Sequence, residues 1–452
     1  MKSASLALAL TILAASSAAG AEDSPAFKPV RVDEDYGYLR TVPHRTGFDR
    51  LRYISLGEEA YLSLGGEARW RVDASSAPRF GLGRETADTF ALGRLLVSGD
   101  LHLGPAIRAY GELGLHRDLG KRAAPSPTDR DSLDAQVLFV DLTPATGWRL
   151  RLGRQELLLN STQRFVAVRE GPNIRQSFDG VRLTGTVGAL KLDAFHLQPV
   201  VVSPGVFDDQ RSRSQRFYGL YVATRLSPLT SLDTYVLGLE RDLVRFGSIT
   251  GDERRISLGA RLSGSAGALD YEAEGVAQGG RFAGRRIQAF AASAGGGYTL
   301  DRHWKPRLGL RLDLGSGDSD PTDQSLETFN PMFPKGAYFN EAGLTSWGNL
   351  TALRASLGVT PARTVALEAS YAIYRCRTGA DAIYLQPLTP LVARCGGPSK
   401  DLGGATQLDG TWQVNRNFKL QGQLVRQTAG EALRVRVGKA VTFATLVTQV
   451  RF

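Results

Sequence analysis

Residues 61–74 alternate between apolar and charged or polar side chains, and this pattern restricts the fold more than any other feature of the 452-residue chain. One face carries apolar residues such as Leu64 and Trp70, whereas the other carries Glu67 and Arg69. An alternation of period two predicts a β-strand. Charged side chains are costly inside a soluble β-core but cost little toward a water-filled lumen, so the pattern predicts a transmembrane β-barrel.

The two ends of the sequence agree with an exported barrel. Residues 1–21 combine Lys2, a short apolar run and a small-residue cleavage pattern, which predicts a signal peptide. The last residues, VTFATLVTQVRF, alternate and end on Phe452, as expected of the closing strand of a bacterial outer-membrane barrel; a half-buried strand of a soluble sandwich is the alternative. No later segment has the roughly 18 consecutive apolar residues of a membrane-spanning helix. We therefore expect the protein to be located in the outer membrane of a Gram-negative bacterium.

Eighteen segments alternate like strands, and sixteen is the alternative count. Short connections such as 104–105 and 185–188 alternate with long ones such as 198–214 and 315–348. Short periplasmic turns and long extracellular loops are typical of single-chain bacterial barrels. The predicted fold class is thus all-β, an antiparallel transmembrane barrel of 18 strands that leaves an aqueous channel. The predicted strands are 61–74, 89–103, 106–117, 133–142, 148–157, 178–184, 189–197, 215–225, 232–241, 254–263, 268–278, 286–298, 304–314, 349–359, 364–375, 402–414, 418–427 and 441–452.

The chain is predicted to have three parts. The signal peptide is followed by an N-terminal segment, residues 22–58, that lacks regular alternation, and the barrel occupies residues 59–452. We expect this segment to lie in the periplasm as a lead-in or as a plug at the lower mouth of the barrel. A disordered tail is the alternative.

Three blocks of the sequence resemble the alginate-export family of outer-membrane β-barrels. They are residues 50–73, residues 151–183 and residues 315–334, the last of which contains the string FNPMFP. With the C-terminal strand, the blocks span nearly the whole chain after the signal peptide. The resemblance implies an eighteen-stranded pore with an arginine-rich constriction that passes a polyuronate.

Arginine suits a pore for acidic sugars because it stays charged and its planar group binds a carboxylate in bidentate fashion. Fixed cations on the wall offset the dehydration of an anionic polymer. Interleaved carboxylates would temper the field and hold the arginines extended. Such ion-pair ladders also stiffen barrel walls whatever the solute, which is the alternative for any single arginine. The candidate pore-lining residues are Arg69, Arg71, Arg94, Arg108, Glu112, Arg151, Arg154, Glu156, Arg164, Arg175, Asp179, Arg182 and Arg354.

The string VREGPNIRQSFDG, residues 168–180, gathers several of these charges in the connection between the fifth and sixth strands. Gly171-Pro172 supplies a turn, so the loop can fold back over the pore. Asp179 interrupts the alternation and is expected to pair with Arg154 or Arg175. The alternative is a rigid, self-paired outer loop that contacts no solute.

Other chemistry is sparse in this sequence. Cys376 and Cys395 are the only cysteines and both belong to one predicted outer loop, so we expect a disulfide in an exported protein. The five histidines are dispersed, and no metal site is expected. Catalytic and nucleotide-binding motifs are missing, so no enzyme and no cofactor are predicted. The acid-rich residues 317–323 are expected to form a solvated loop, with calcium binding as the alternative.

The predicted function is an outer-membrane channel for the passive export or diffusion of an anionic polysaccharide, an alginate-like polyuronate, through an arginine-lined pore. The alternative is an anion-selective porin for small acidic solutes; a barrel enzyme is disfavoured. Expected partners are the acidic polysaccharide or oligosaccharide, outer-membrane lipid and lipopolysaccharide, the barrel-assembly machinery and periplasmic export-complex proteins, but no nucleic acid. The net charge of +10 agrees with contacts to lipopolysaccharide phosphates.

Overall fold

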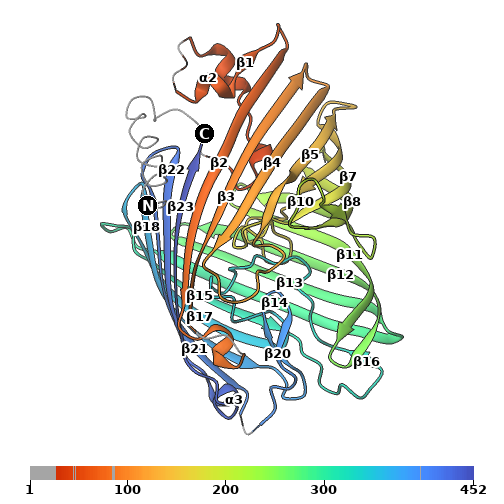
Figure 1. The fold of residues 1–452 in the computed structure, drawn as a ribbon, viewed down its shortest axis with the longest axis vertical. Helices are drawn as coiled ribbons and strands as arrows, with labels where there is room; N and C mark the ends of the chain where they lie inside the picture. Colours follow the sequence, from red (N-terminus) through yellow and green to blue (C-terminus); the bar gives the residue numbers. More distant parts are fainter. Residues whose placement is uncertain (1–26, 44, 46, 84–86, 398) are drawn as a thin grey trace.

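The computed structural model describes residues 27–43, 45, 47–83, 87–397 and 399–452 (Figure 1). Eighteen antiparallel strands form a barrel that closes by pairing the first barrel strand, β2, with the last, β23. The predicted fold class and strand count are therefore confirmed. The predicted signal peptide lies outside the described residues. Among those residues, no helix has the length and apolarity needed to cross a membrane.

Each predicted strand overlaps an observed one, and the largest differences are at strand ends. The predicted strand 254–263, for example, extends over Ile249–Ala266. The barrel strands are β2 (Ala60–Ser75), β3 (Asp88–Leu103), β4 (Ile107–Leu119), β5 (Asp131–Leu142), β6 (Trp148–Glu156), β7 (Ser177–Val187), β8 (Leu190–Val201), β10 (Gln215–Ser227), β11 (Thr230–Phe246), β12 (Ile249–Ala266), β13 (Leu269–Phe282), β14 (Arg285–Thr299), β15 (Arg307–Gly315), β17 (Leu350–Ala362), β18 (Val365–Cys376), β21 (Asp401–Gln413), β22 (Phe418–Gln427) and β23 (Val441–Arg451).

Short elements decorate both ends of the barrel. Three two-residue strands extend the barrel sheet, and one separate hairpin forms in a loop. The short strands are β1 (Ile54–Ser55), β9 (Gln210–Arg211), β16 (Ser325–Leu326), β19 (Ile383–Leu385) and β20 (Thr389–Val392), and the short helices are η1 (Arg31–Asp33), η2 (Gly37–Thr41), η3 (Pro78–Gly81), α2 (Asp49–Arg52) and α3 (Glu431–Arg434).

The two ends of the barrel differ in the length of their connections. One end, here called the short-turn end, joins strands by tight turns such as residues 188–189 and also carries β1 and α2 (Figure 1). The other, the long-loop end, has connections such as 157–176 and 316–349. Residues 283–284 are an exception at that end. Ala283 and Gly284 both have positive φ, as a two-residue hairpin requires, and long strands take the place of a long loop there.

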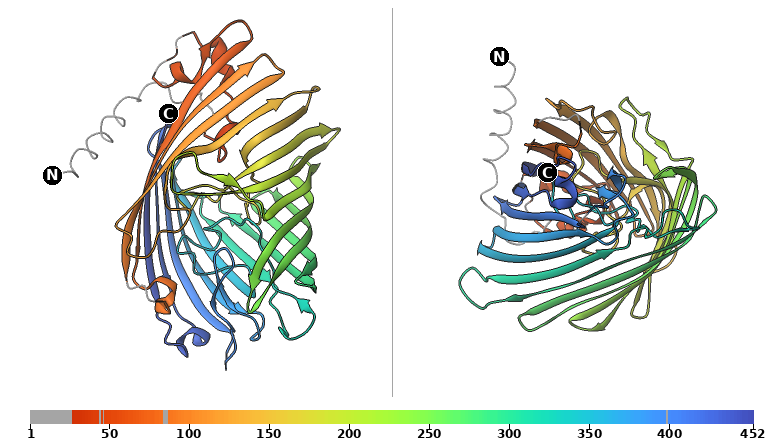
Figure 2. Two further views of the ribbon diagram at one scale, coloured as in Figure 1. Left: turned by 45° about the vertical axis from the view of Figure 1, so that its right-hand side comes forward. Right: turned by 90° about the horizontal axis from the view of Figure 1, so that it is seen from below.

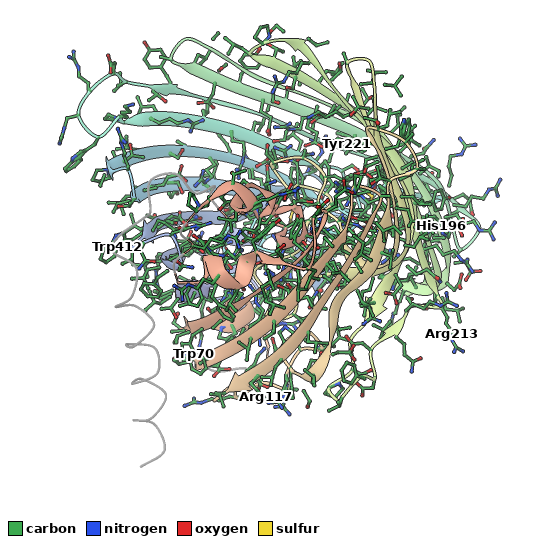
Figure 3. The ribbon with its side chains drawn as sticks, turned by 90° about the horizontal axis from the view of Figure 1, so that it is seen from above. Trp70, Arg117, His196, Arg213, Tyr221 and Trp412 are labelled. Carbon is green, nitrogen blue, oxygen red and sulfur yellow. A yellow bond between two sulfur atoms is a disulfide. The ribbon has the colours of Figure 1, made fainter. Side chains whose placement is uncertain are left out.

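Side chains alternate across the barrel wall as the sequence predicts. Leu138 is 60% exposed and Leu258 is 62% exposed on the outer surface, whereas Glu67 is fully buried on the inner side. Trp70 and Trp412 point away from the interior (Figure 3). The outer surface is thus apolar enough to face lipid, and the charged face lies inside.

Two long loops fold into the barrel from the long-loop end (Figure 2). Residues 157–176 and residues 316–349 meet there as short paired segments: the backbone N–H of Ala167 donates to the Phe333 carbonyl at 2.9 Å. Their aromatic side chains pack with aromatic residues of the inner wall in one buried hydrophobic cluster. This cluster contains Phe165, Phe329, Phe333, Phe339 and Trp347 from the loops and Phe178 and Phe217 from β7 and β10. The lumen beside these strands is therefore filled by a hydrophobic core.

Candidate functional site: the luminal cavity

Carboxylates of the wall pair with most of the predicted pore arginines. Arg151 binds Asp141 through two hydrogen bonds, of 2.7 and 2.8 Å, between β6 and β5. Arg182 binds Asp193 in the same bidentate way at 2.9 and 2.6 Å. Such pairs cancel much of the field of each guanidinium, so these arginines brace the wall more than they attract anions. The remaining pairs of this kind are Arg108 with Asp100, Arg71 with Asp73 and Glu341, and Arg354 with Glu368.

A charge network joins the inner faces of β2, β3 and β6 to the inward loop. Arg94 Nη2 donates to Glu67 Oε1 at 2.6 Å and also contacts Glu170 from the inward loop. Arg175 reaches Glu156 at 2.9 Å and Glu170 at 3.4 Å. Burial alone would raise the pKa of Glu170, but Arg94 and Arg175 outweigh burial and lower that pKa to about 2. The loop carboxylate therefore stays ionised and anchors the loop to the wall.

The string 168–180 folds inward and contacts the wall. Arg71 Nη1 donates to the Gly171 carbonyl at 2.9 Å, and Asn173 Nδ2 donates to the Gly93 carbonyl at 3.0 Å. Arg154 Nε donates to Asp179 at 2.9 Å, so Asp179 pairs with one of its two expected partners. The loop therefore folds into the barrel, and the alternative of an outer loop does not describe it.

Arg154 and Arg164 lie away from this part of the lumen. Arg154 also contacts Asp134 at 3.3 Å, and the alternation of β6 places it on the same outer face as Leu152, so the prediction that Arg154 lines the pore is wrong. Arg164 is part of the inward loop and binds Glu272 and Glu274 of β13. Their charges are neutralised locally, as are those of the wall pairs.

A cavity of about 340 Å³ lies between β2, β21, β22 and β23 on one side and the inward loops on the other. Of the candidate pore-lining residues predicted from the sequence, only Arg69 lines it. Arg69 donates to the carbonyl oxygens of Pro172 and Gly171, at 3.3 and 3.4 Å, and forms no ion pair with a described residue. Lys28, Lys335 and Lys419 also line the cavity without an ion pair in the described part of the chain. These four cations give the cavity an electropositive lining.

The cations and amides of the cavity are aligned across neighbouring strands. Lys419 of β22 lies opposite Gln449 of β23, and Gln449 lies opposite Arg69 of β2. Neighbouring strands are about 4.8 Å apart, so the backbones of the two cations are roughly 10 Å apart with an amide between them. Gln421 and Gln423 follow Lys419 along the same face of β22 and also line the cavity. The period-two spacing in the sequence KLQGQ would have placed these three residues on the inner face. They were not predicted because only arginines and carboxylates were considered.

The acidic residues of the cavity are few, and most of them are compensated. Glu341 binds Arg71 at 2.8 Å, and Glu170 belongs to the network described above. Asp409 accepts hydrogen bonds from the amides of Gln407 and Gln423, at 2.6 and 2.5 Å, and forms no ion pair with a described cation. Arg451 lines the cavity but binds Glu67 at 3.2 Å. The unpaired charges of the lining are therefore mainly positive.

Two further predicted features lie near the long-loop end. Cys376, at the end of β18, and Cys395 are joined by a disulfide. In the 317–323 loop, burial and the carboxylates of Asp381 and Glu327 raise the pKa of Asp318 to about 6. Within the described ranges, one group of three acidic side chains is close enough to hold a cation. It consists of Asp134, Asp208 and Asp209 and lies outside the 317–323 loop.

Comparison with known proteins places this architecture in a family. The model of the family described as "Alginate export" matches residues 60–447. A search of curated protein sequences finds no significant match. Among solved structures, the barrel is similar to OccK8 (OprE) of Pseudomonas aeruginosa, at 11% identity and a TM-score of 0.59, over 86% of this chain and 98% of that one.

Two other solved structures show the same likeness. OccAB1 of Acinetobacter baumannii is 10% identical with a TM-score of 0.59, over 90% of this chain and 99% of that chain. OccK2 (OpdF) of Pseudomonas aeruginosa, solved in complex with glucuronate, is 12% identical with a TM-score of 0.56, over 86% and 98% of the two chains. At these identities the likeness supports the fold alone. The family match covers nearly all of the barrel, and the chain belongs to the alginate-export family of outer-membrane β-barrels.

Proposed function

We propose that this outer-membrane channel passes an acidic saccharide, an alginate-like polyuronate or its oligosaccharides, along the cavity lined by Lys28, Arg69, Lys335 and Lys419. The observation that supports the proposal most directly is that these cations have no ion-pair partner among the described residues while the other predicted pore arginines do. An unpaired cation on a pore wall offsets the dehydration of a passing carboxylate. A paired one contributes much less, because its partner already takes its hydrogen bonds.

The uncharged lining favours a sugar over a small inorganic anion. Gln421, Gln423 and Gln449 offer amide donors and acceptors, and Thr411 and Thr445 offer hydroxyl groups. A saccharide can exchange the water around its hydroxyl groups for such partners as it moves. Lysine is a point charge on a flexible stem, so it holds a carboxylate less rigidly than a bidentate arginine does. That difference suits passage, which requires release as well as capture.

A second candidate is a porin for small acidic solutes such as single uronates. The complex of OccK2, a barrel of similar fold, with glucuronate favours this candidate. The same four cations would serve both functions. The two candidates differ in whether a long polymer can thread the cavity.

Planar-bilayer recordings on the purified chain test the proposal. We expect anion preference in a KCl gradient, and block of the current by polygalacturonate but not by neutral dextran of similar length. Block by galacturonate monomer, without transfer of the polymer to the opposite chamber, would favour the small-solute porin. Cation preference together with the absence of any block by either acidic sugar would contradict both candidates.

A further inference from the structure

Residues 27–34 lie inside the barrel mouth at the short-turn end, where the segment that contains them crosses the opening (Figure 3). Val30 and Val32 are 6% and 2% exposed and pack in a small hydrophobic cluster. The cluster includes Tyr110 of β4 and Phe139 of β5. Apolar burial of this kind holds the segment against the inner wall.

The backbone of the segment accepts hydrogen bonds from arginines of the lumen. Arg451 donates to the Lys28 carbonyl at 2.8 Å, Arg175 to the Pro29 carbonyl at 2.7 Å, and Arg108 to the Val32 carbonyl at 2.8 Å. Arg108 and Arg175 are two of the arginines that the sequence assigns to the pore. The oxygens of the segment therefore occupy donors that the oxygens of an acidic saccharide would use.

Arg31 completes the attachment by charge. Its guanidinium donates to both oxygens of Glu112, each at 2.6 Å, and to Glu67 at 3.0 Å. All three side chains are buried, at 7%, 1% and 0% exposure. Buried carboxylates need such a partner, so the loss of Arg31 from the lumen leaves Glu112 without its bidentate cation.

The rest of the N-terminal region is held independently of these contacts. β1 pairs with β2 through Ile54 opposite Leu62, and Arg416 binds Asp49 at 3.0 Å. Residues 27–34 can therefore leave the lumen while residues 49–55 stay attached to the short-turn end.

We propose that residues 27–34 form a removable plug: in the closed channel their carbonyl groups occupy arginine donors of the lumen and Arg31 binds Glu67 and Glu112, and an acidic saccharide opens the channel by competing for the arginine donors. The displacement step rests on the proposed function, whereas the closed state rests only on the contacts above. Lys28 belongs both to the plug and to the cavity lining, which places the plug within reach of the solute. Arg108, Arg175 and Arg451 keep their carboxylate partners, and the saccharide oxygens would take over by mass action only the N–H donors that the Val32, Pro29 and Lys28 carbonyl groups release.

Deletion of residues 27–34 tests the closed state. We expect the single-channel conductance in KCl to rise by roughly twofold or more, because ion flow follows the open cross-section of a pore. Arg31→Gln keeps the segment but removes the cation that binds Glu67 and Glu112, and should raise the fraction of time that the channel spends open. Arg50→Gln is the matched control, since Arg50 is exposed and its side chain donates, among the described residues, only to the Arg45 carbonyl. Retention of heat-modifiable mobility in gel electrophoresis shows that a variant has folded.

Unchanged conductance and open probability in a folded deletion variant, or in folded Arg31→Gln if the deletion does not assemble, would overturn the plug. The anion preference of the intact chain is measured separately, so that result leaves the proposed function standing. Displacement is tested by trypsin cleavage of the intact chain after Arg31. Polygalacturonate should accelerate this cleavage several-fold and neutral dextran should not; equal rates would overturn opening by the saccharide.

Discussion

Lys419 and Arg69 lie in one row of the barrel wall, on either side of a single strand, and both face the luminal cavity. Neither forms an ion pair with a described residue. Changing both to glutamine should shift the reversal potential in a KCl gradient toward zero and weaken block by polygalacturonate about tenfold, since one lost charge-assisted contact costs roughly 1.4 kcal/mol or more.

The control for this variant is a change that leaves the net charge unaltered. Arg182→Gln combined with Asp193→Asn removes a cation and its bidentate anion together. We expect the selectivity of this double variant to remain that of the original chain. Equal losses in both variants would show that the neutralised wall arginines contribute as much as the unpaired cations.

Arg175 should be structurally essential. It and Glu156 are 2% exposed and form an ion pair at 2.9 Å. Arg175→Met leaves Glu156 as an uncompensated buried carboxylate, which should lower the free energy of unfolding by about 3–5 kcal/mol. Arg216→Met breaks an exposed pair with Glu240 and should cost about 1 kcal/mol or less. Urea unfolding in lipid vesicles, followed by tryptophan fluorescence, measures both; comparable losses would contradict the distinction.

The raised pKa of Asp318 predicts a dependence of stability on pH. The pKa of about 6 in the folded chain exceeds the ordinary value of 3.8, so folding favours the protonated form. That contribution is complete below the ordinary pKa and is lost as the pH rises through the folded pKa. Asp318→Asn cannot ionise and should flatten the fall in thermal midpoint between about pH 4 and about pH 6. An unaltered pH profile in the variant would assign the titration to another group.

The disulfide between Cys376 and Cys395 should stabilise the loop that it closes. The two cysteines are 19 residues apart in the sequence, and closing a loop of similar length restricts the unfolded chain by about 3 kcal/mol. Replacing both cysteines by serine should therefore lower the thermal midpoint measured without reductant. Mass spectrometry of the non-reduced chain is the direct check: two alkylatable thiols in the folded protein would contradict the disulfide.

Much of the barrel follows from local sequence. The alternation around Glu67 and Arg69 predicts which side chains face the lumen, because successive side chains of any strand point to opposite faces. Asp179 interrupts that alternation, and its pairing with Arg154 follows from the need of a carboxylate for a nearby cation. Strand order is also local in an antiparallel barrel, where each strand pairs with the next.

The candidate site was predicted only in part. The sequence indicates which side chains are charged and which face the lumen, and Arg69 was among the predicted residues. It does not indicate which luminal arginines are paired with a carboxylate. Lys419 and Gln449 were missed because single lysines and glutamines carry no motif of their own. Arg31 was missed because its partners, Glu67 and Glu112, are 36 and 81 residues away in the chain.

Local periodicity thus determined the strands, their number and the polar inner face, since these depend on the geometry of one chain segment and its neighbour. Tertiary structure alone decided which arginines are neutralised, that two outer loops fill part of the lumen, and that residues 27–34 lie inside it. These outcomes depend on distances between segments far apart in sequence. An arginine attracts a solute only when no carboxylate has been folded against it, and the closed barrel sets that distance.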